Sequence, residues 1–222
     1  MPKSMKRIII VNEGETEQEF CKDVLQPHFL RQDILIEYPT IKKSGGGIVA
    51  WESLKKQIDN HLKQDPTAFV TTLIDYYGIN GKLKFPKWDE AKAVVDKNHR
   101  LSFLEQSMKE LIDASHNYRF IPYIQLHEFE GLLFNNIDVF KSQIAPNEFK
   151  NYEELVKTIN DYPNPELIND GKTTAPSKRL QSLIIGYNKP VYGSILAEAI
   201  GLPKIRAKCP RFNDWITILE AV

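Results

Sequence analysis

Residues 7–14 read Arg-Ile-Ile-Ile-Val-Asn-Glu-Gly, and this stretch decides the fold that the sequence predicts. The run of β-branched residues at 8–11 is typical of a strand that is buried on both faces. It stops before Glu13, and residues 16–26 then have a helical pattern with Pro27 as its predicted end. A buried strand followed directly by a helix predicts the first unit of a parallel sheet.

The same alternation continues outward from this unit. Further strands are expected at residues 34–41, 68–74 and 120–126, with helical patterns at residues 48–62, 88–98 and 101–114 between them. Pro122 indicates an edge position or a strand start for the last strand. The order predicts an α/β fold with a mostly parallel, Rossmann-like sheet flanked by helices and joined by right-handed crossovers.

The strand signals fade in the C-terminal part of the chain. Residues 152–159, 177–185, 191–200 and 213–219 have helical patterns that proline and glycine interrupt. We therefore expect an α/β domain over residues 1–135 and a helical C-terminal extension over residues 136–222 that packs on it.

Composition excludes several classes of protein. The 222 residues include 29 Lys+Arg and 29 Asp+Glu, with 42% hydrophobic and 26% charged residues, which argues against a disordered or collagenous chain. A net charge of zero argues against nucleic-acid binding by bulk charge alone, as in histones. Cys21 and Cys209 lie far apart, and no run approaches the roughly 18 apolar residues that a membrane span needs. We expect a reduced, cytoplasmic protein without a membrane contact.

Acidic residues stand where three of the predicted strands end. Glu13 follows the first strand with Glu17 four residues on, Asp75 ends the third, and Glu128 and Glu130 follow the fourth. The carboxyl ends of parallel strands meet at one sheet edge, so these carboxylates are expected to converge. Clustered carboxylates need a cation to stay ionised together, and hard oxygen ligands favour Mg²⁺ or Mn²⁺. The alternatives are acids at a helix N-terminus, an aspartate that caps a turn and a solvated loop.

The C-terminal part also carries a charge asymmetry that the net charge hides. Between residues 170 and 211, eight basic residues stand against two acidic ones, with aromatic residues between them. One interpretation is a solvated helical surface. The other is a face that contacts the phosphates of a nucleic acid beside the acidic site. The residues predicted to bind phosphate are Lys172, Lys178, Arg179, Lys208 and Arg211.

A glycine turn at residues 45–47 supplies a weaker alternative. The spacing Gly45-x-Gly47-x-x-Ala50 matches a loose dinucleotide-binding pattern, but it follows the second strand rather than the first. A tight turn or a nest of backbone amides for phosphate is the preferred interpretation. A nucleotide-binding metabolic enzyme remains a third class of function.

Several sequence motifs together resemble those of a prokaryotic Toprim-like family that is described as a domain of unknown function. The resemblance spans nearly the whole chain. The motifs that carry it are residues 11–17 (VNEGETE), 72–78 (TLIDYYG), 125–130 (QLHEFE), 174–179 (TAPSKR) and 209–215 (CPRFNDW). It implies a metal-dependent, nuclease-like subunit that is often encoded beside an ATPase of the ABC or structural-maintenance-of-chromosomes type, in settings of phage defence.

On this resemblance, Glu13, Asp75 and Glu128 are the expected catalytic residues. Glu17 and Glu130 join them as expected ligands of Mg²⁺ or Mn²⁺. The sequence departs from the pattern at one place, because many Toprim domains carry Asp-x-Asp where Asp75 is followed by two tyrosines. Glu128 and Glu130 are the candidates to supply the second acid; without it, the expectation is a site with one metal ion or with weak catalysis. Two hypotheses follow: a nuclease subunit that acts on DNA or RNA, and a non-catalytic Toprim-like subunit that binds an ATPase.

Overall fold

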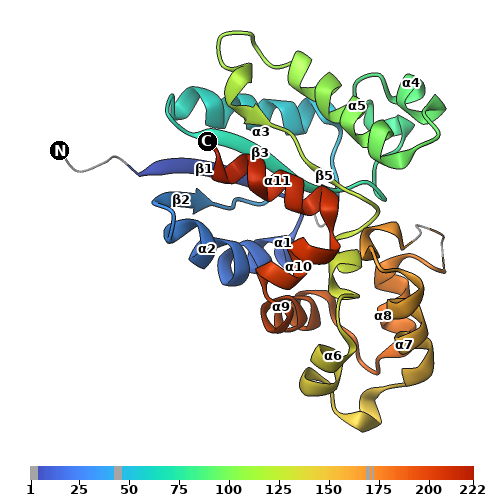
Figure 1. The fold of residues 1–222 in the computed structure, drawn as a ribbon. Helices are drawn as coiled ribbons and strands as arrows, with labels where there is room; N and C mark the ends of the chain where they lie inside the picture. Colours follow the sequence, from blue (N-terminus) through green and yellow to red (C-terminus); the bar gives the residue numbers. More distant parts are fainter. Residues whose placement is uncertain (1–4, 43–46, 169–170, 172) are drawn as a thin grey trace.

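The protein has a five-stranded parallel sheet in the order β2-β1-β3-β4, with β5 also paired to β3 (Figure 1). The computed structural model describes residues 5–42, 47–168, 171 and 173–222. The strands are β1 (Lys6–Asn12), β2 (Ile34–Glu37), β3 (Phe69–Asp75), β4 (Phe120–Ile121) and β5 (Ile124–Gln125). The predicted α/β class and parallel sheet are confirmed.

Helices lie between the first four strands, as connections between parallel strands require. Between β1 and β2 lie α1 (Glu15–Phe20), the π-helical turn η1 (Cys21–Leu25) and α2 (Gln26–Leu30). Helix α3 (Trp51–Gln64) joins β2 to β3. The connection from β3 to the last strands contains η2 (Gly81–Leu83), α4 (Trp88–Ala93), α5 (Lys97–Glu110) and η3 (Asn117–Arg119).

The predicted helix end at Pro27 is wrong. The Gln26 N–H bonds to the Cys21 carbonyl, five residues back, and this wider π-helical turn leads into α2. Pro27 therefore lies in the first turn of α2, where its missing N–H needs no helical acceptor. The chain continues as a helix to Leu30.

The sheet separates two hydrophobic cores. Alternate residues of β1 point to opposite faces, so Ile8 and Ile10 lie in one core and Ile9 and Val11 in the other. The second core is closed by α3 and α5. The first contains residues of α1, α2 and most of the C-terminal helices, so residues 136–222 share it with the N-terminal part.

The C-terminal half is helical, as the sequence predicts. Its helices are η4 (Phe129–Leu133), α6 (Ile137–Gln143), η5 (Pro146–Glu148), α7 (Tyr152–Asp161), η6 (Pro165–Leu167), α8 (Pro176–Leu183), α9 (Lys189–Ile200), α10 (Leu202–Lys208) and α11 (Pro210–Glu220). In Figure 1, α11 lies across the sheet, while α6, α7 and α8 project away from it.

Trp215 connects α11 to the sheet. Its indole stacks on the Tyr123 ring with 4.5 Å between the ring centroids, and its Nε1–H donates to Thr71 Oγ1 over 2.9 Å. Tyr123 lies between β4 and β5, where Pro122 interrupts the edge strand. A helix from the far end of the sequence therefore packs on one face of the sheet, next to its edge strand.

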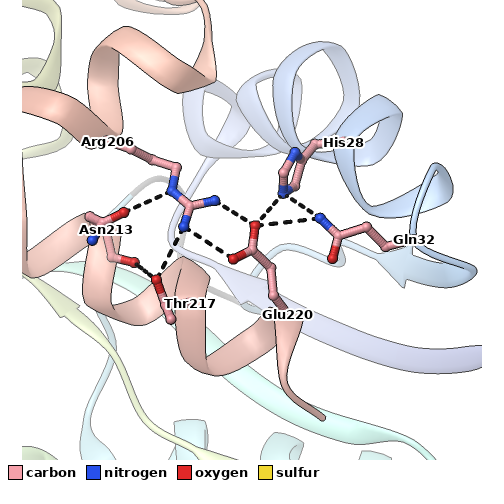
Figure 2. A network of polar contacts seen from close by, with 6 residues as sticks. All are labelled: His28, Gln32, Arg206, Asn213, Thr217 and Glu220. Atoms are coloured by element: carbon pink, nitrogen blue, oxygen red, sulfur yellow. Dashed lines mark hydrogen bonds and ion pairs between the residues drawn. The ribbon is translucent and has the colours of Figure 1, made fainter.

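A polar network joins the same helix to α2 (Figure 2). The Glu220 carboxylate of α11 accepts hydrogen bonds from Arg206 of α10 and from Gln32, and lies 2.7 Å from His28 Nε2 of α2. Burial opposes ionisation of Glu220, but these hydrogen bonds outweigh it and lower the pKa of the carboxyl. Arg206 also bonds to Asn213 and Thr217, so its guanidinium is part of the fold.

In the part of the chain that the structure describes, no helix has the length and apolar character needed to cross a membrane.

We expect Trp215→Ala to lower the free energy of unfolding by about 3–5 kcal/mol, because it removes a buried indole and leaves a cavity between α11 and the sheet. Trp215→Phe keeps a ring for the stack and loses the hydrogen bond to Thr71, so about 1 kcal/mol is expected. Ile218→Ala, at a half-exposed position of the same helix, is the control, with a loss below about 1 kcal/mol. Urea unfolding measures all three. A Trp215→Ala chain as stable as the control would contradict this account.

Candidate functional site

The acids predicted at the strand ends meet at the carboxyl edge of the sheet. Strand β3 is paired with β1 and with β5, so the segments after all three strands are neighbours. Glu13 follows β1, and its Oε2 accepts the backbone N–H of Asp75 at the end of β3 over 2.9 Å. Asp75 Oδ1 in turn accepts the backbone N–H of Phe129 over 2.8 Å. The carboxylate of Glu13 thus connects the end of β1 to the end of β3, and the carboxylate of Asp75 connects the end of β3 to the segment after β5.

Glu17 reaches the same edge from α1. Its Oε2 accepts the backbone N–H of Gly14 over 3.0 Å, which satisfies a free donor at the start of the helix. The N-cap of α1 is Gly14. Burial and the nearby charge of Glu13 raise the pKa of Glu17 to about 6.

Glu13 and Asp75 are also held in surroundings that disfavour their charge. Burial raises the pKa of Glu13, and Glu130 and Glu128 add to the rise. Burial raises the pKa of Asp75 well above its usual range, with repulsion from Glu13, Glu17 and Glu130 as further causes. These mutual effects place the acids within one electrostatic cluster. We use "carboxylate cluster" for Glu13, Glu17, Asp75 and Glu130.

Glu130 is the most deeply buried member, with no exposed surface. Its Oε1 lies 2.8 Å from the ammonium of Lys189 at the start of α9. The contact is an ion pair, and among the described residues neither Glu130 oxygen accepts a well-directed hydrogen bond. Burial raises the pKa of Glu130 to about 7 although Lys189 opposes the rise.

Lys189 balances part of this negative charge. Its charge stabilises the ionised forms of Glu13, Glu17, Asp75 and Glu130. Burial disfavours the ammonium, but attraction to Glu130 and Asp75 outweighs burial and raises the pKa of Lys189.

Glu128 has a different position, because both its oxygens are engaged by one residue. Glu128 Oε2 accepts the Ser177 backbone N–H over 2.9 Å, and Oε1 accepts the Ser177 hydroxyl over 3.0 Å. Ser177 lies in the first turn of α8, where a carboxylate satisfies free N–H groups and interacts favourably with the helix dipole. The expected catalytic Glu128 therefore caps a helix.

His127, which precedes Glu128, has a left-handed backbone conformation. His127 has φ of 66°, a conformation that non-glycine residues adopt rarely. Its carbonyl accepts the Tyr77 backbone N–H over 2.9 Å, and the following turn directs Glu128 to α8 and the Phe129 N–H to Asp75. The imidazole Nε2 lies 3.4 Å from Lys97 Nζ.

The donor chemistry of the cluster suits a hard divalent cation, but the side-chain positions do not. In the described residues, no three acidic, histidine or cysteine side chains are arranged to hold a metal ion. The reason is visible in the contacts: the carboxylates of Glu13, Glu17 and Asp75 each accept a backbone N–H, and Glu130 faces an ammonium. As it stands, the arrangement does not fit Mg²⁺ or Mn²⁺.

The basic residues predicted to bind phosphate are divided by the fold. Lys178 is exposed on α8, where its ammonium bonds to Gln181, and it follows Ser177 directly. Arg179 is mostly buried, donates to the Thr174 carbonyl and lies over the Tyr162 ring. Lys172 lies outside the described residues.

The other two basic residues make contacts inside the protein. Lys208 donates to the Asn135 carbonyl over 2.6 Å. Arg211 pairs with Glu105, donates to the Ile124 carbonyl and packs over the Tyr123 ring. The structure does not bring these two together with Lys178, and it gives both a role in holding the C-terminal helices. The glycine turn at residues 45–46 is outside the described residues.

Sequence reasoning missed the residues that contact two of the acids. Lys189 is one of the eight basic residues between positions 170 and 211, and Ser177 lies in the motif at residues 174–179, but the sequence alone assigns a function to neither. Each meets its acid only through the packing of α8 and α9, so local spacing held no signal for either pair. Tyr187, just before α9, was also missed: burial, with Glu130 and Glu128, raises the pKa of its hydroxyl.

Comparison with known proteins gives one family. A family model described as Domain of unknown function (DUF4276) matches residues 12–220. No curated protein matches the chain, and no solved structure does.

With no divalent cation present, we expect the carboxylate cluster to lower the free energy of unfolding as pH rises from about 5 to 7. Glu17 and Glu130, with pKa values of about 6 and 7, stay protonated in the folded chain after the unfolded chain has released these protons above about pH 4.5. Stability from a raised pKa is complete below the unfolded pKa and is lost as pH passes the folded pKa. Each proton contributes up to roughly 1.4 kcal/mol per pH unit.

Urea unfolding in EDTA measures this slope, and Glu17→Gln is the comparison. The amide keeps an acceptor for the Gly14 N–H but does not titrate, so the slope should become smaller. Burial lowers the pKa of His61, which makes stability rise with pH, whereas Glu166, with a pKa of about 7, makes stability fall as the cluster does. Both residues are present in the two chains, so they do not affect the comparison. Equal slopes for the two chains would contradict the prediction.

We expect Ser177→Ala to lower the free energy of unfolding by about 1–3 kcal/mol, because it leaves one oxygen of the buried Glu128 carboxylate without its donor. Ser182→Ala is the matched control, since Ser182 is exposed on the same helix and bonds to a carbonyl of its own helix. Its effect should stay within about 0.5 kcal/mol. Thermal and urea unfolding compare the two, and equal losses would show that the Glu128 cap is not stabilising.

Proposed function

Because the chain belongs to the family described as Domain of unknown function (DUF4276), whose description names no activity, we propose a function from the site: a Toprim-like, Mg²⁺- or Mn²⁺-dependent nuclease subunit. The observation that carries the proposal is the convergence of Glu13, Glu17, Asp75 and Glu130 at the carboxyl edge of a parallel sheet. Open α/β sheets bind their ligands at this edge.

The electrostatics of the cluster support a site rather than a structural cap. Burying four carboxylates beside one another is unfavourable, as their raised pKa values indicate. Strongly perturbed groups that lie together are typical of functional sites. Carboxylate oxygens are the donors that a hard cation prefers, and such a cation would favour the ionised forms of these acids.

The proposed substrate is a nucleic acid, with Lys178 as the best-placed phosphate contact. Lys178 is exposed and follows Ser177, whose hydroxyl and N–H hold Glu128 beside the carboxylate cluster. An ammonium at this place would attract the phosphate backbone without regard to base sequence. Because the side chains do not fit a metal ion as they stand, we derive no step of cleavage through one.

A specific observation favours a second candidate, a non-catalytic Toprim-like subunit that binds an ATPase. Tyr77 stands where many Toprim domains have a second acid. Of the two candidates to replace it, Glu128 has both oxygens engaged by Ser177, and Glu130 is paired with Lys189. In this case the sheet edge serves as a binding platform. For either candidate, the ABC- or structural-maintenance-type ATPase partner and the role in phage defence rest on the family resemblance and are proposals.

We expect the purified chain to cleave plasmid DNA or RNA with Mn²⁺ or Mg²⁺ and not with EDTA. The double substitution Glu13→Gln, Asp75→Asn should lower the rate at least about 100-fold, since both acids are needed to hold the cation. Glu198→Gln, an exposed acid on α9, is the control and should cleave at the wild-type rate. Gel assays with supercoiled plasmid and with labelled RNA measure the rates.

Equal cleavage by the wild type and the double variant would contradict the nuclease proposal. Absence of cleavage, with a stable complex between the chain and the ATPase encoded beside it, would support the second candidate. Size-exclusion chromatography of the two proteins measures the complex, and its persistence with the double variant would show that the acids are not part of the contact.

A further inference from the structure

The position of Lys189 carries an inference about how the carboxylate cluster is neutralised. Lys189 is the first residue of α9, whose N-cap Asn188 accepts the Val191 N–H. Helix α9 packs closely on α1, since a Cβ atom at Gly193 would lie 2.9 Å from Thr16 Cγ2. The start of α9 is therefore held beside the helix that carries Glu17.

Lys189 and Glu130 form an ion pair, and the Glu130 carboxylate has few other polar contacts. Lys189 Nζ lies 2.8 Å from Glu130 Oε1. Glu130 has no exposed surface, and within the described residues its oxygens accept no well-directed hydrogen bond. A buried carboxylate without donors is costly, so the ammonium is its main compensation.

The charge of Lys189 acts beyond this one pair. Its attraction also favours the ionised forms of Glu13, Glu17 and Asp75, which come from three further segments of the chain. This is the electrostatic effect that a bound divalent cation would have on the same four carboxylates. An ammonium beside the cluster repels a second cation. Within the described residues, no three acidic, histidine or cysteine side chains are arranged to hold a metal ion.

We propose that Lys189 is the resident cation of the carboxylate cluster and that a divalent cation binds there only by displacing its ammonium from Glu130. The inference rests on the proposed function in one respect, the identity of the metal site. It explains why Glu130, whose oxygens are donors that suit Mg²⁺ or Mn²⁺, faces an ammonium instead.

The first test removes the ammonium by Lys189→Met, which keeps a long apolar stem. With EDTA at pH 8, the variant should melt at a lower temperature than the wild type, because the cluster has lost its cation. Mn²⁺ should raise its melting temperature more than that of the wild type, and calorimetry should give an affinity for Mn²⁺ at least tenfold higher. Lys204→Met, at an exposed lysine of α10, is the matched control and should behave as the wild type does.

The proposal is overturned if Lys189→Met binds Mn²⁺ no more tightly than the wild type. If neither chain binds Mn²⁺, the metal site of the proposed function is contradicted. The melting temperatures in EDTA then decide by themselves whether Lys189 is the resident cation. A larger loss for Lys189→Met than for Lys204→Met then supports the resident cation, and equal losses overturn it.

A second measurement uses the wild-type chain, in case the variant does not fold. Acetylation of lysines, followed by mass spectrometry, compares the reactivity of Lys189 with and without saturating Mn²⁺. Displacement from Glu130 predicts severalfold faster acetylation of Lys189 with Mn²⁺ and no change at Lys204. Unchanged reactivity of Lys189 at a concentration of Mn²⁺ that binds would overturn the proposal.

Discussion

The hydrogen bond from the Asp75 backbone N–H to the Glu13 carboxylate is the contact on which the rest of the site depends. It brings an acid from the end of β1 onto the end of β3, and Asp75 repeats the arrangement by accepting the N–H of Phe129. Carboxylates taken out of water need donors or a cation. Backbone N–H groups at the strand ends supply one donor each, and the surplus of negative charge calls for Lys189.

Helix N-termini satisfy the remaining buried acids. Glu128 accepts two hydrogen bonds from Ser177 at the start of α8, and Glu166 accepts the backbone N–H groups of Arg211 and Phe212 at the start of α11. Each pair joins a segment after the sheet to a helix far along the chain. The C-terminal helices are thus part of the site and of the first hydrophobic core, in addition to covering the sheet.

The fold was largely predictable because its signals are local. The β-branched runs, the helical spacings and Pro122 indicated the parallel strands, their connections and the edge position. The helix end predicted at Pro27 was wrong, because the π-helical turn before it places Pro27 in the first turn of α2, where a proline does not interrupt the helix. The basic stretch was less informative, because the guanidinium of Arg211 and the ammonium of Lys208 make their contacts inside the protein. Counting charges along a sequence does not show which of them face solvent.

By itself, the sequence determined which acids reach the carboxyl edge, because strand ends follow from the local hydrophobic pattern and parallel strands end together. Only the tertiary structure decided how their charge is held. Glu128 became a helix cap and Glu130 an ion-paired carboxylate although they are two residues apart, since the left-handed turn at His127 and the packing of α8 and α9 select their partners. Burial and pairing are properties of the packed chain, and they set the pKa of each acid in the cluster.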